Sequence, residues 1–101
     1  MIVTFEKIYL KELYETGRTS DKKHRYQPEI VKRYRRCIEL MKNTETIASL
    51  AKYNSLNYEM LKGDKQGISS IRVNDKYRIE FSVNESIVTV CNIIELSNHY
   101  K

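Results

Sequence analysis

Apolar and polar residues alternate along one stretch, residues 70–83, which reads Ser70-Ile71-Arg72-Val73-Asn74-Asp75-Lys76-Tyr77-Arg78-Ile79-Glu80-Phe81-Ser82-Val83. Successive side chains of a strand point to opposite faces, so a period of two predicts two strands that each have one apolar face. Asn74-Asp75 interrupts the alternation with residues that favour turns, which predicts a hairpin between the two strands. The stretch therefore places an antiparallel sheet at the centre of the fold.

The segments around this hairpin extend the sheet. After a second connection at Asn84-Glu85, residues 87–96 are rich in β-branched residues and predict a third long strand. Met60-Leu61 lies before the turn-like Lys62-Gly63-Asp64 and is a candidate for a further short strand. The second half of the chain is therefore expected to form a meander.

Helical spacing marks the first half of the chain. Apolar residues recur every three or four positions through residues 6–16 and Gly17 follows them, which predicts a helix after a short strand at residues 2–5. Pro28 suits the first turn of a second helix that runs to about Lys42 and has one apolar face, formed by Ile30, Val31, Tyr34, Cys37, Ile38 and Met41. Residues 18–27 are polar and predict an exposed connection or a partly helical turn.

These elements predict an α+β fold in which two N-terminal helices pack on one face of a twisted antiparallel β-sheet. We expect the polar face of that sheet to stay open and to display Arg72 or Arg78. A slip of one residue in strand register would move either side chain to the buried face.

Length and composition narrow the class of protein. The chain has 101 residues, so we expect one domain over residues 1–101 that carries any activity on its own core. Its apolar runs are far shorter than the roughly 20 residues that span a bilayer, and its start has no signal-peptide pattern. We therefore expect a soluble, cytoplasmic protein that does not engage a membrane.

Cysteine and histidine are too few for an obvious metal site. The sequence has two cysteines, Cys37 and Cys91, no Cys-x-x-Cys pair, and two histidines, His24 and His99. A zinc site would have to gather all four at one point. We expect instead two reduced, buried cysteines and no metal or other cofactor.

The positive charge of the chain is confined to one segment. The formal net charge is +5, yet residues 18–36 alone carry eight basic and two acidic residues, a local charge of +6. These basic residues are Arg18, Lys22, Lys23, Arg25, Lys32, Arg33, Arg35 and Arg36. Such a patch is typical of a surface that contacts nucleic-acid phosphates, although a solvated helix face or a dock for an acidic protein would look the same.

The familiar motifs of nucleotide binding, zinc-dependent hydrolysis and α/β-hydrolases do not occur. The second half of the chain instead holds a set of polar residues, namely Glu59, Lys62, Lys65, Arg72, Arg78, His99 and Tyr100. Metal-free cleavage of a phosphodiester needs a base, an acid and cations near the phosphoryl oxygens, and this set contains all three types. The alternatives are a surface role for His99 and, for Arg78, a cross-strand ion pair with a neighbour such as Glu80 or Glu95.

The segment from Leu61-Lys62-Gly63-Asp64 through the hairpin, with Gly67-Ile68-Ser69-Ser70-Ile71-Arg72-Val73-Asn74 and Tyr77-Arg78-Ile79-Glu80-Phe81, resembles a sequence block of the HigB group of RelE/ParE-type toxins. The N-terminal segment around Leu13-Tyr14-Glu15-Thr16-Gly17 and the basic second helix match as well. The resemblance implies a RelE-like fold and the activity of that group, which cleaves mRNA on the ribosome. It also implies a partner, a HigA-like helix-turn-helix antitoxin, with no cofactor.

The resemblance also implies roles for individual residues. Lys62, Arg72 and Arg78 correspond to positions that contact RNA or shape the site. The mechanism implied is metal-independent attack of a ribose 2′-OH on the adjacent phosphate, with His99 or Glu59 as base and Tyr100 or His99 as acid. The cations at Lys22, Lys23, Arg25, Lys32, Arg33, Arg35, Arg36 and Lys65 are then candidates for RNA or ribosome contacts.

The sequence departs from the group's pattern at three places. Relatives often have His where this chain has Glu59, and end in Asp-Tyr-His where this chain has Asn98-His99-Tyr100. The Trp of the block is replaced by Ile68 or Ser69, which removes one platform for stacking a base. Two alternatives therefore stay open: a toxin of the same fold that inhibits DNA gyrase, as the ParE branch does, and a non-catalytic module that binds RNA or the ribosome.

Overall fold

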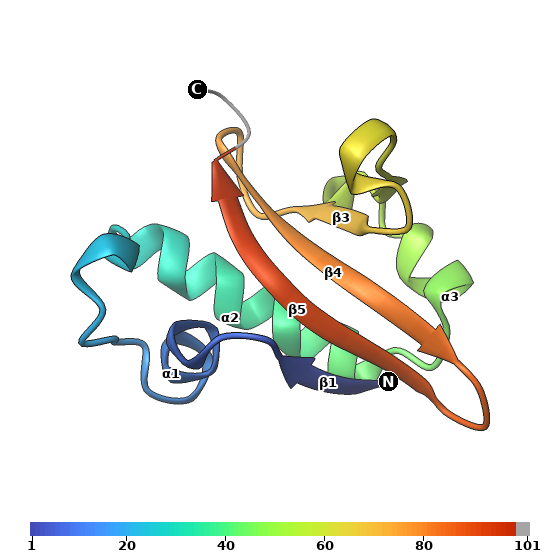
Figure 1. The fold of residues 1–101 in the computed structure, drawn as a ribbon, viewed down its shortest axis with the longest axis horizontal. Coiled ribbons are helices and arrows are strands. Elements are labelled where there is room, and N and C mark those ends of the chain that lie inside the picture. The colour runs from blue at the N-terminus through green and yellow to red at the C-terminus, as the bar shows by residue number, and fades with distance from the viewer. Residues whose placement is uncertain (99–101) are drawn as a thin grey trace.

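The computed structural model describes residues 1–98, which form five strands, three α-helices and three short 3-10 turns around one sheet (Figure 1). The strands are β1 (Ile2–Phe5), β2 (Glu59–Met60), β3 (Ser69–Arg72), β4 (Tyr77–Glu85) and β5 (Thr89–Asn98). The helices are α1 (Ile8–Thr16), α2 (Pro28–Asn43) and α3 (Ile47–Ala51). The short 3-10 turns are η1 (Lys22–His24), η2 (Asn54–Leu56) and η3 (Gly63–Lys65).

The sheet has the strand order β1-β5-β4-β3-β2. Neighbouring strands run antiparallel except at one edge, where β1 lies parallel to β5 with Val3 opposite Cys91. The predicted hairpin joins β3 to β4, and the side chain of Asn74 closes it by accepting hydrogen bonds from the backbone amides of Lys76 and Tyr77 at 2.9 and 2.8 Å. This turn fixes Ile71 opposite Ile79 and Arg72 opposite Arg78.

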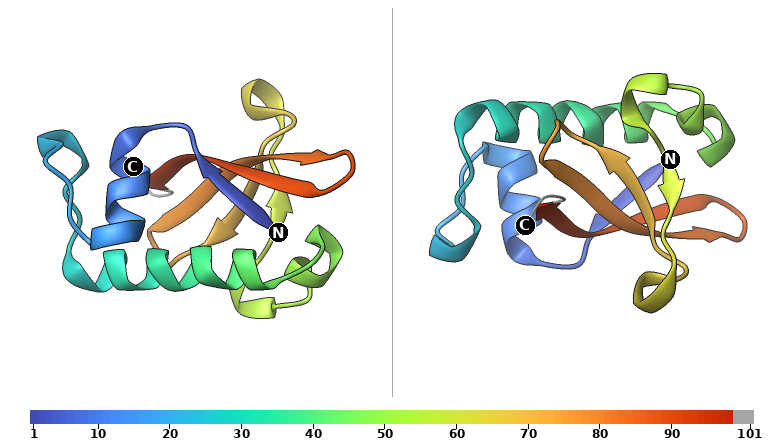
Figure 2. Two further views of the ribbon diagram at one scale, coloured as in Figure 1. Left: turned by 90° about the horizontal axis from the view of Figure 1, so that it is seen from below. Right: turned by 90° about the horizontal axis from the view of Figure 1, so that it is seen from above.

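Helices α1 and α2 cover one face of the sheet, and α2 runs across it (Figure 2). All six residues of the predicted apolar face of α2 are buried. They pack with Leu10 and Leu13 of α1 against the apolar residues of the sheet, which include Ile71, Ile79, Phe81 and Leu96. The apolar faces of the strands and of the two helices thus pack together in one core.

Local chemistry sets the ends of the two long helices. Gly17 ends α1 in the left-handed conformation, with φ of +78°, and its amide donates to the carbonyl of Leu13 at 3.0 Å. Glycine adopts such a φ without steric cost. Pro28 begins α2, at a position whose backbone N–H would have no partner within the helix, so the missing N–H of proline costs no hydrogen bond.

The predicted fold class is confirmed, with three differences in detail. Helix α3 and the turn η2 were not expected, because a helix of five residues is too short for a periodic pattern to show. The first helix begins at Ile8 rather than residue 6, and the last strand begins at Thr89 rather than residue 87. The parallel pairing of β1 was not expected either.

Two further expectations are confirmed. Residues 18–27 form a connection with one 3-10 turn, and Cys37 and Cys91 are buried as free thiols. Within residues 1–98, no helix is long and apolar enough to cross a membrane.

Candidate active site and RNA-binding surface

The strand register brings the candidate residues into two rows across the sheet. One row runs Ser97–Arg78–Arg72 across β5, β4 and β3. The other runs Glu95–Glu80–Ser70–Glu59 across β5, β4, β3 and β2. Arginines and carboxylates that are far apart in the sequence therefore lie side by side on the sheet.

Arg78 is not displayed on an open face, so of the two arginines expected there only Arg72 is exposed. Its side chain is 8% exposed, and Nε donates to Oγ of Ser70 at 2.5 Å. Nη2 donates to the carbonyl of Asn57 at 2.7 Å and to that of Ser70 at 3.2 Å. The guanidinium is buried among partners from β3 and the segment that leads into β2, which alternation along β4 alone does not reveal.

The ion pairs of this buried network also differ from those expected. Arg78 pairs with Glu59, Nη2 to Oε1 3.8 Å, rather than with Glu80 or Glu95. Glu80 is itself buried, and both of its carboxylate oxygens accept hydrogen bonds from Lys65 at 3.0 and 3.1 Å. This contact raises the pKa of Lys65 above its ordinary value, so Lys65 keeps its positive charge beside the Glu80 carboxylate.

Arg72 is the accessible arginine of the row. Its side chain is 42% exposed and forms an ion pair with Asp75 of the hairpin. It also lines a hollow of about 620 Å³ between the hairpin and the start of α2, to which Arg33, Lys76 and Tyr77 contribute. An arginine in this position is free to exchange a surface carboxylate for an incoming phosphate.

Two of the other predicted catalytic residues lie on or after the edge strand β2. Lys62 is exposed just before the turn η3, and Glu59 is about half exposed on the edge strand β2. His99 and Tyr100 lie outside the described residues. The last described residue, Asn98, is opposite Tyr77 in the register, so β5 leads to the hairpin end of the sheet.

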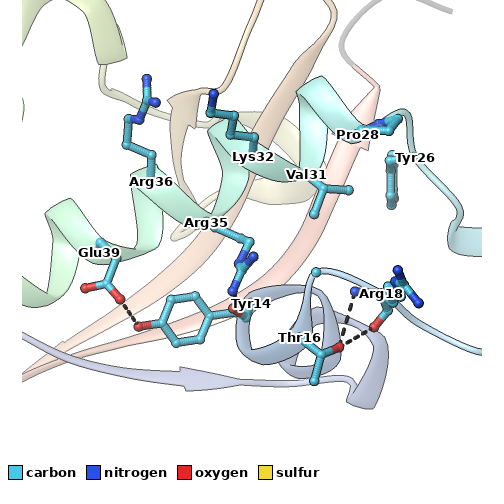
Figure 3. A pocket seen from close by; sticks show the side chains of 11 residues that line it. Tyr14, Thr16, Arg18, Tyr26, Pro28, Val31, Lys32, Arg35, Arg36 and Glu39 are labelled. Carbon is cyan, nitrogen blue, oxygen red and sulfur yellow. Dashed lines mark hydrogen bonds between the residues drawn. The ribbon is translucent and has the colours of Figure 1, made fainter.

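The basic residues of segment 18–36 form an exposed surface along the connection and α2. Lys22, Lys23, Arg25, Lys32, Arg33 and Arg36 are all exposed. Arg35 is engaged elsewhere, because its Nε donates to the carbonyl of Tyr14 at 3.0 Å and thereby caps the end of α1. Figure 3 shows the side chains of Lys32 and Arg36 projecting from α2.

A second hollow lies between the end of α1 and α2 and has a volume of about 680 Å³ (Figure 3). Tyr26, Pro28 and Val31 form its apolar part. Across it, the hydroxyl of Tyr14 donates to Glu39 at 2.5 Å. The hollow thus combines an apolar floor with a cationic rim.

Sequence reasoning missed the contacts that four residues make to hold this region together. Ser70 and Asn57 supply the acceptors for Arg78, and Glu80 holds Lys65. Tyr26 donates from its hydroxyl to the carbonyl of Leu96 at 3.1 Å, 70 positions along the chain. Polar residues inside the alternating stretch were a signal for Ser70 and Glu80, whereas no local pattern marks Asn57 or Tyr26.

The fold has counterparts among solved structures. It matches a YoeB/ParE toxin from Agrobacterium tumefaciens with a TM-score of 0.63, at 22% identity over 99% of this chain and 100% of that one. It matches YafQ from E. coli strain BL21(DE3) with a TM-score of 0.64, at 9% identity over 96% of this chain and 91% of that one. It also matches a chain of a YoeB–YefM complex from Staphylococcus aureus, with a TM-score of 0.55, at 21% identity over 99% of this chain and 98% of that one.

These likenesses show the fold, an α+β fold of the RelE type. A comparison with curated sequences finds no significant match. Residues 3–94, however, match the HigB-like toxin family, described as the RelE-like toxin of the type II toxin-antitoxin system HigB. The chain therefore belongs to the HigB-like toxin family, whose members are mRNA-cleaving endoribonucleases, and its partner is a cognate antitoxin.

Proposed function

We propose that this toxin cuts mRNA on the ribosome by attack of a ribose 2′-OH on the adjacent phosphate, without a metal ion. The bond from the 2′-oxygen to phosphorus forms, and the bond from phosphorus to the 5′-oxygen breaks. A base takes the proton of the 2′-OH and an acid gives one to the leaving 5′-oxygen. The products are a 2′,3′-cyclic phosphate and a 5′-hydroxyl end.

The observation that carries this proposal is the pairing of Arg72 with Arg78 beside the end of β5. Negative charge grows on the phosphoryl oxygens during the reaction, and prearranged cations stabilise it most effectively. Arg72 is accessible and is proposed to contact the phosphate, with Lys62 as a second cation. Arg78 is buried, so its proposed role is to hold Glu59 and the strand β3 in place.

Proton transfer is assigned to the residues that the family resemblance singled out. Histidine as a residue type has an ordinary pKa near neutral, so His99 is proposed as base or acid, with Tyr100 as the second partner. Glu59 is the alternative base, because its carboxylate lies 3.8 Å from Arg78 and is about half exposed to an incoming RNA strand. Both assignments leave the cations in the same roles.

The exposed cations of the connection and α2 are proposed to dock the toxin on ribosomal RNA. They are Lys22, Lys23, Arg25, Lys32, Arg33 and Arg36, all exposed, while Lys65 is paired with Glu80 nearer the proposed site. The ribosome would hold the mRNA in a reactive geometry, which supplies a large part of the acceleration when acid and base groups are few. Such a toxin acts in the cytoplasm, where ribosomes and mRNA are.

The antitoxin is proposed to be a HigA-like helix-turn-helix protein. Support comes from the family match and from the structural likeness to a toxin bound to its partner in the YoeB–YefM complex. We propose that residues 1–101 act as one toxin domain in this pair. One domain would then carry the docking surface, the cleavage site and the surface that the antitoxin covers.

Alanine variants of His99 and Arg72 test the proposal in cells. We expect both variants to lose growth arrest and mRNA cleavage while keeping their melting temperature and their binding to the antitoxin. Lys52→Ala, which removes an exposed cation at the end of α3, serves as the control and should stay toxic. Full toxicity of both His99→Ala and Arg72→Ala would sink the nuclease proposal and favour gyrase inhibition or simple RNA binding.

A further inference from the structure

A third hollow lies where α2, the turn η2 and the end of β3 meet, and its volume is about 290 Å³. Three arginines line it, Arg33 and Arg36 from α2 and Arg72 from β3. Its floor is apolar and consists of Cys37, Leu40, Leu56 and Val73. Within residues 1–98 no acidic side chain lines this hollow, so it combines three positive charges with an apolar floor.

The three arginines have only exposed partners, or none, in the described part of the chain. Arg33 Nε lies 3.4 Å from Oε1 of Glu29, and both side chains are more than half exposed. Arg72 pairs with Asp75, whose side chain is 85% exposed. Arg36 has no hydrogen bond or ion pair within residues 1–98. Because exposed ion pairs contribute little to stability, an incoming phosphate can replace these carboxylates at little cost.

The floor of the hollow is uncharged at neutral pH. Burial raises the pKa of the Cys37 thiol to about 11, so the sulfur keeps its proton. That thiol donates to the backbone carbonyl of Arg72 at 3.9 Å, which places the end of β3 against α2. Leu56 and Val73 are buried and Leu40 is partly buried. A ligand in this hollow therefore meets an apolar surface below it and cations at the rim.

The third hollow adjoins the one beside the hairpin. Arg33 and Arg72 line both hollows and form the wall that the two share. The hairpin hollow adds two more cations, Arg25 and Lys76, and the ring of Tyr77. Cations interleaved with aromatic or apolar surface are typical of sites that bind single-stranded nucleic acid. An RNA strand with a phosphate on Arg72 therefore has the third hollow directly beside it.

We propose that the third hollow binds one unpaired nucleotide of the mRNA, next to the nucleotide whose phosphate contacts Arg72, with its phosphate on Arg33 and Arg36 and its base on the apolar floor. This inference rests on the proposed function, because it takes Arg72 as a contact of the cleaved phosphate. A guanidinium suits this ligand, since it binds phosphate oxygens in pairs and stacks on planar rings. The volume is near the lower limit of small-ligand pockets, roughly 300 Å³, and so suits one base.

Ser55 allows a test that leaves every arginine in place, because it lines the hollow and carries no charge. Ser55→Glu adds a carboxylate at the hollow, whereas Asn54→Glu adds the same charge at the neighbouring exposed residue of η2, which does not line it. On ribosomes programmed with mRNA, we expect Ser55→Glu to raise KM about five- to tenfold with kcat changed less than about twofold, as for lost uniform binding. Asn54→Glu should change neither constant, and both variants should associate normally with ribosomes that carry no mRNA. Equal KM values for the two variants would overturn the inference.

Methyl NMR of the full chain gives a readout that does not need cleavage. Titration with a short oligouridylate should shift the methyl signals of Leu40, Leu56 and Val73 and leave that of Ile93, buried on β5, unchanged. Duplex RNA of the same length should shift them much less, because its paired bases cannot enter the hollow. Shifts with oligoglutamate and none with oligouridylate would overturn the inference in favour of an acidic protein segment.

Photocrosslinking identifies the RNA that occupies the hollow on the ribosome. The mRNA carries 4-thiouridine on either side of a 2′-deoxy nucleotide at the cleavage position, and we expect crosslinks to the tryptic peptide of residues 37–42, which contributes to the floor. Absence of this crosslink with a toxin that cuts unmodified mRNA would overturn the inference alone. A wild-type toxin that cuts no mRNA on ribosomes would overturn the proposed function, and with it the assignment of the hollow to mRNA.

Discussion

Two arginines of the same hairpin differ in surroundings although they face each other in the register. Arg78 is buried and bonded to Ser70 and to the carbonyl of Asn57, whereas Arg72 is 42% exposed and paired only at the surface with Asp75. A buried charge needs such partners, because its desolvation is costly otherwise. Loss of toxicity therefore has a different meaning at each position.

Replacing each arginine with alanine separates stability from chemistry. We expect Arg78→Ala to lower the free energy of unfolding by about 2–3 kcal/mol, because Ser70 and Asn57 lose a charged hydrogen-bond partner. Arg72→Ala should change it by less than about 0.5 kcal/mol, as for other exposed residues. Urea unfolding followed by circular dichroism measures both. Equal losses in the two variants would contradict the burial of Arg78.

The sequence predicted which residues of this region carry charge and which strands hold them, but not their burial. Alternation places Arg78, Glu80 and Ser70 on the face away from the apolar core, and the structure agrees. Their buried contacts are made with residues of the segment 57–65, which lie 15 to 21 positions away from their partners on β4 in the sequence. The periodicity of apolar residues describes one strand at a time and does not predict contacts between segments so far apart in the sequence.

At the scale of elements, α2 has two functions on opposite faces. Its six apolar residues were all predicted from the helical period, and all are buried. On the other face its cations are exposed, and one of them, Arg35, also caps α1. Gly17 has a φ of +78° and lies against the Arg35 guanidinium, so the end of α1 is in direct contact with the basic face of α2.

Charge reversal on α2 tests its proposed docking role. We expect Arg33→Glu combined with Arg36→Glu to weaken ribosome association strongly, and to reduce the dependence of association on salt, because phosphate contacts release counterions. Lys7→Glu with Lys52→Glu changes the net charge equally at exposed positions outside α2 and should have little effect. Sedimentation with ribosomes at several salt concentrations measures this. Wild-type binding that does not respond to salt would point to a protein surface as the dock.

At the scale of the whole molecule, the first and last described strands are neighbours. Strand β1 pairs with β5, and β5 pairs with β4, so closing the sheet requires contacts across nearly the entire chain. The sequence predicted β1 as a strand but not its place, since a strand of four residues has no signal for its neighbour. Neither the residue pattern nor the family resemblance predicted its parallel pairing with β5.

Several buried groups make the fold sensitive to alkali. Burial raises the pKa of Cys37 and of Cys91 to about 11, and it raises that of Tyr34 above its ordinary range. Each group is protonated in the folded state at a pH where the unfolded chain has lost the proton. Their contribution to stability is therefore complete below about pH 9 and is lost as the pH rises through the folded values.

We expect the free energy of unfolding to fall by a few kcal/mol, on the order of one for each unit of raised pKa, between about pH 8 and about pH 11. Urea unfolding in reducing buffer at several pH values measures this. The double variant Cys37→Ala, Cys91→Ala should be less stable throughout and should show a smaller fall. Stability that stays constant over this range would contradict the burial of these thiols.

The central claim is that a ribose 2′-OH of the mRNA is the nucleophile. The most direct test programs ribosomes with an mRNA that carries a single 2′-deoxy nucleotide on the 5′ side of the cleaved bond, with unmodified mRNA as the control. The toxin should cut the control to leave a cyclic phosphate and a 5′-hydroxyl, and should leave the substituted bond intact. Cleavage of the deoxy-substituted bond at an undiminished rate would contradict the account.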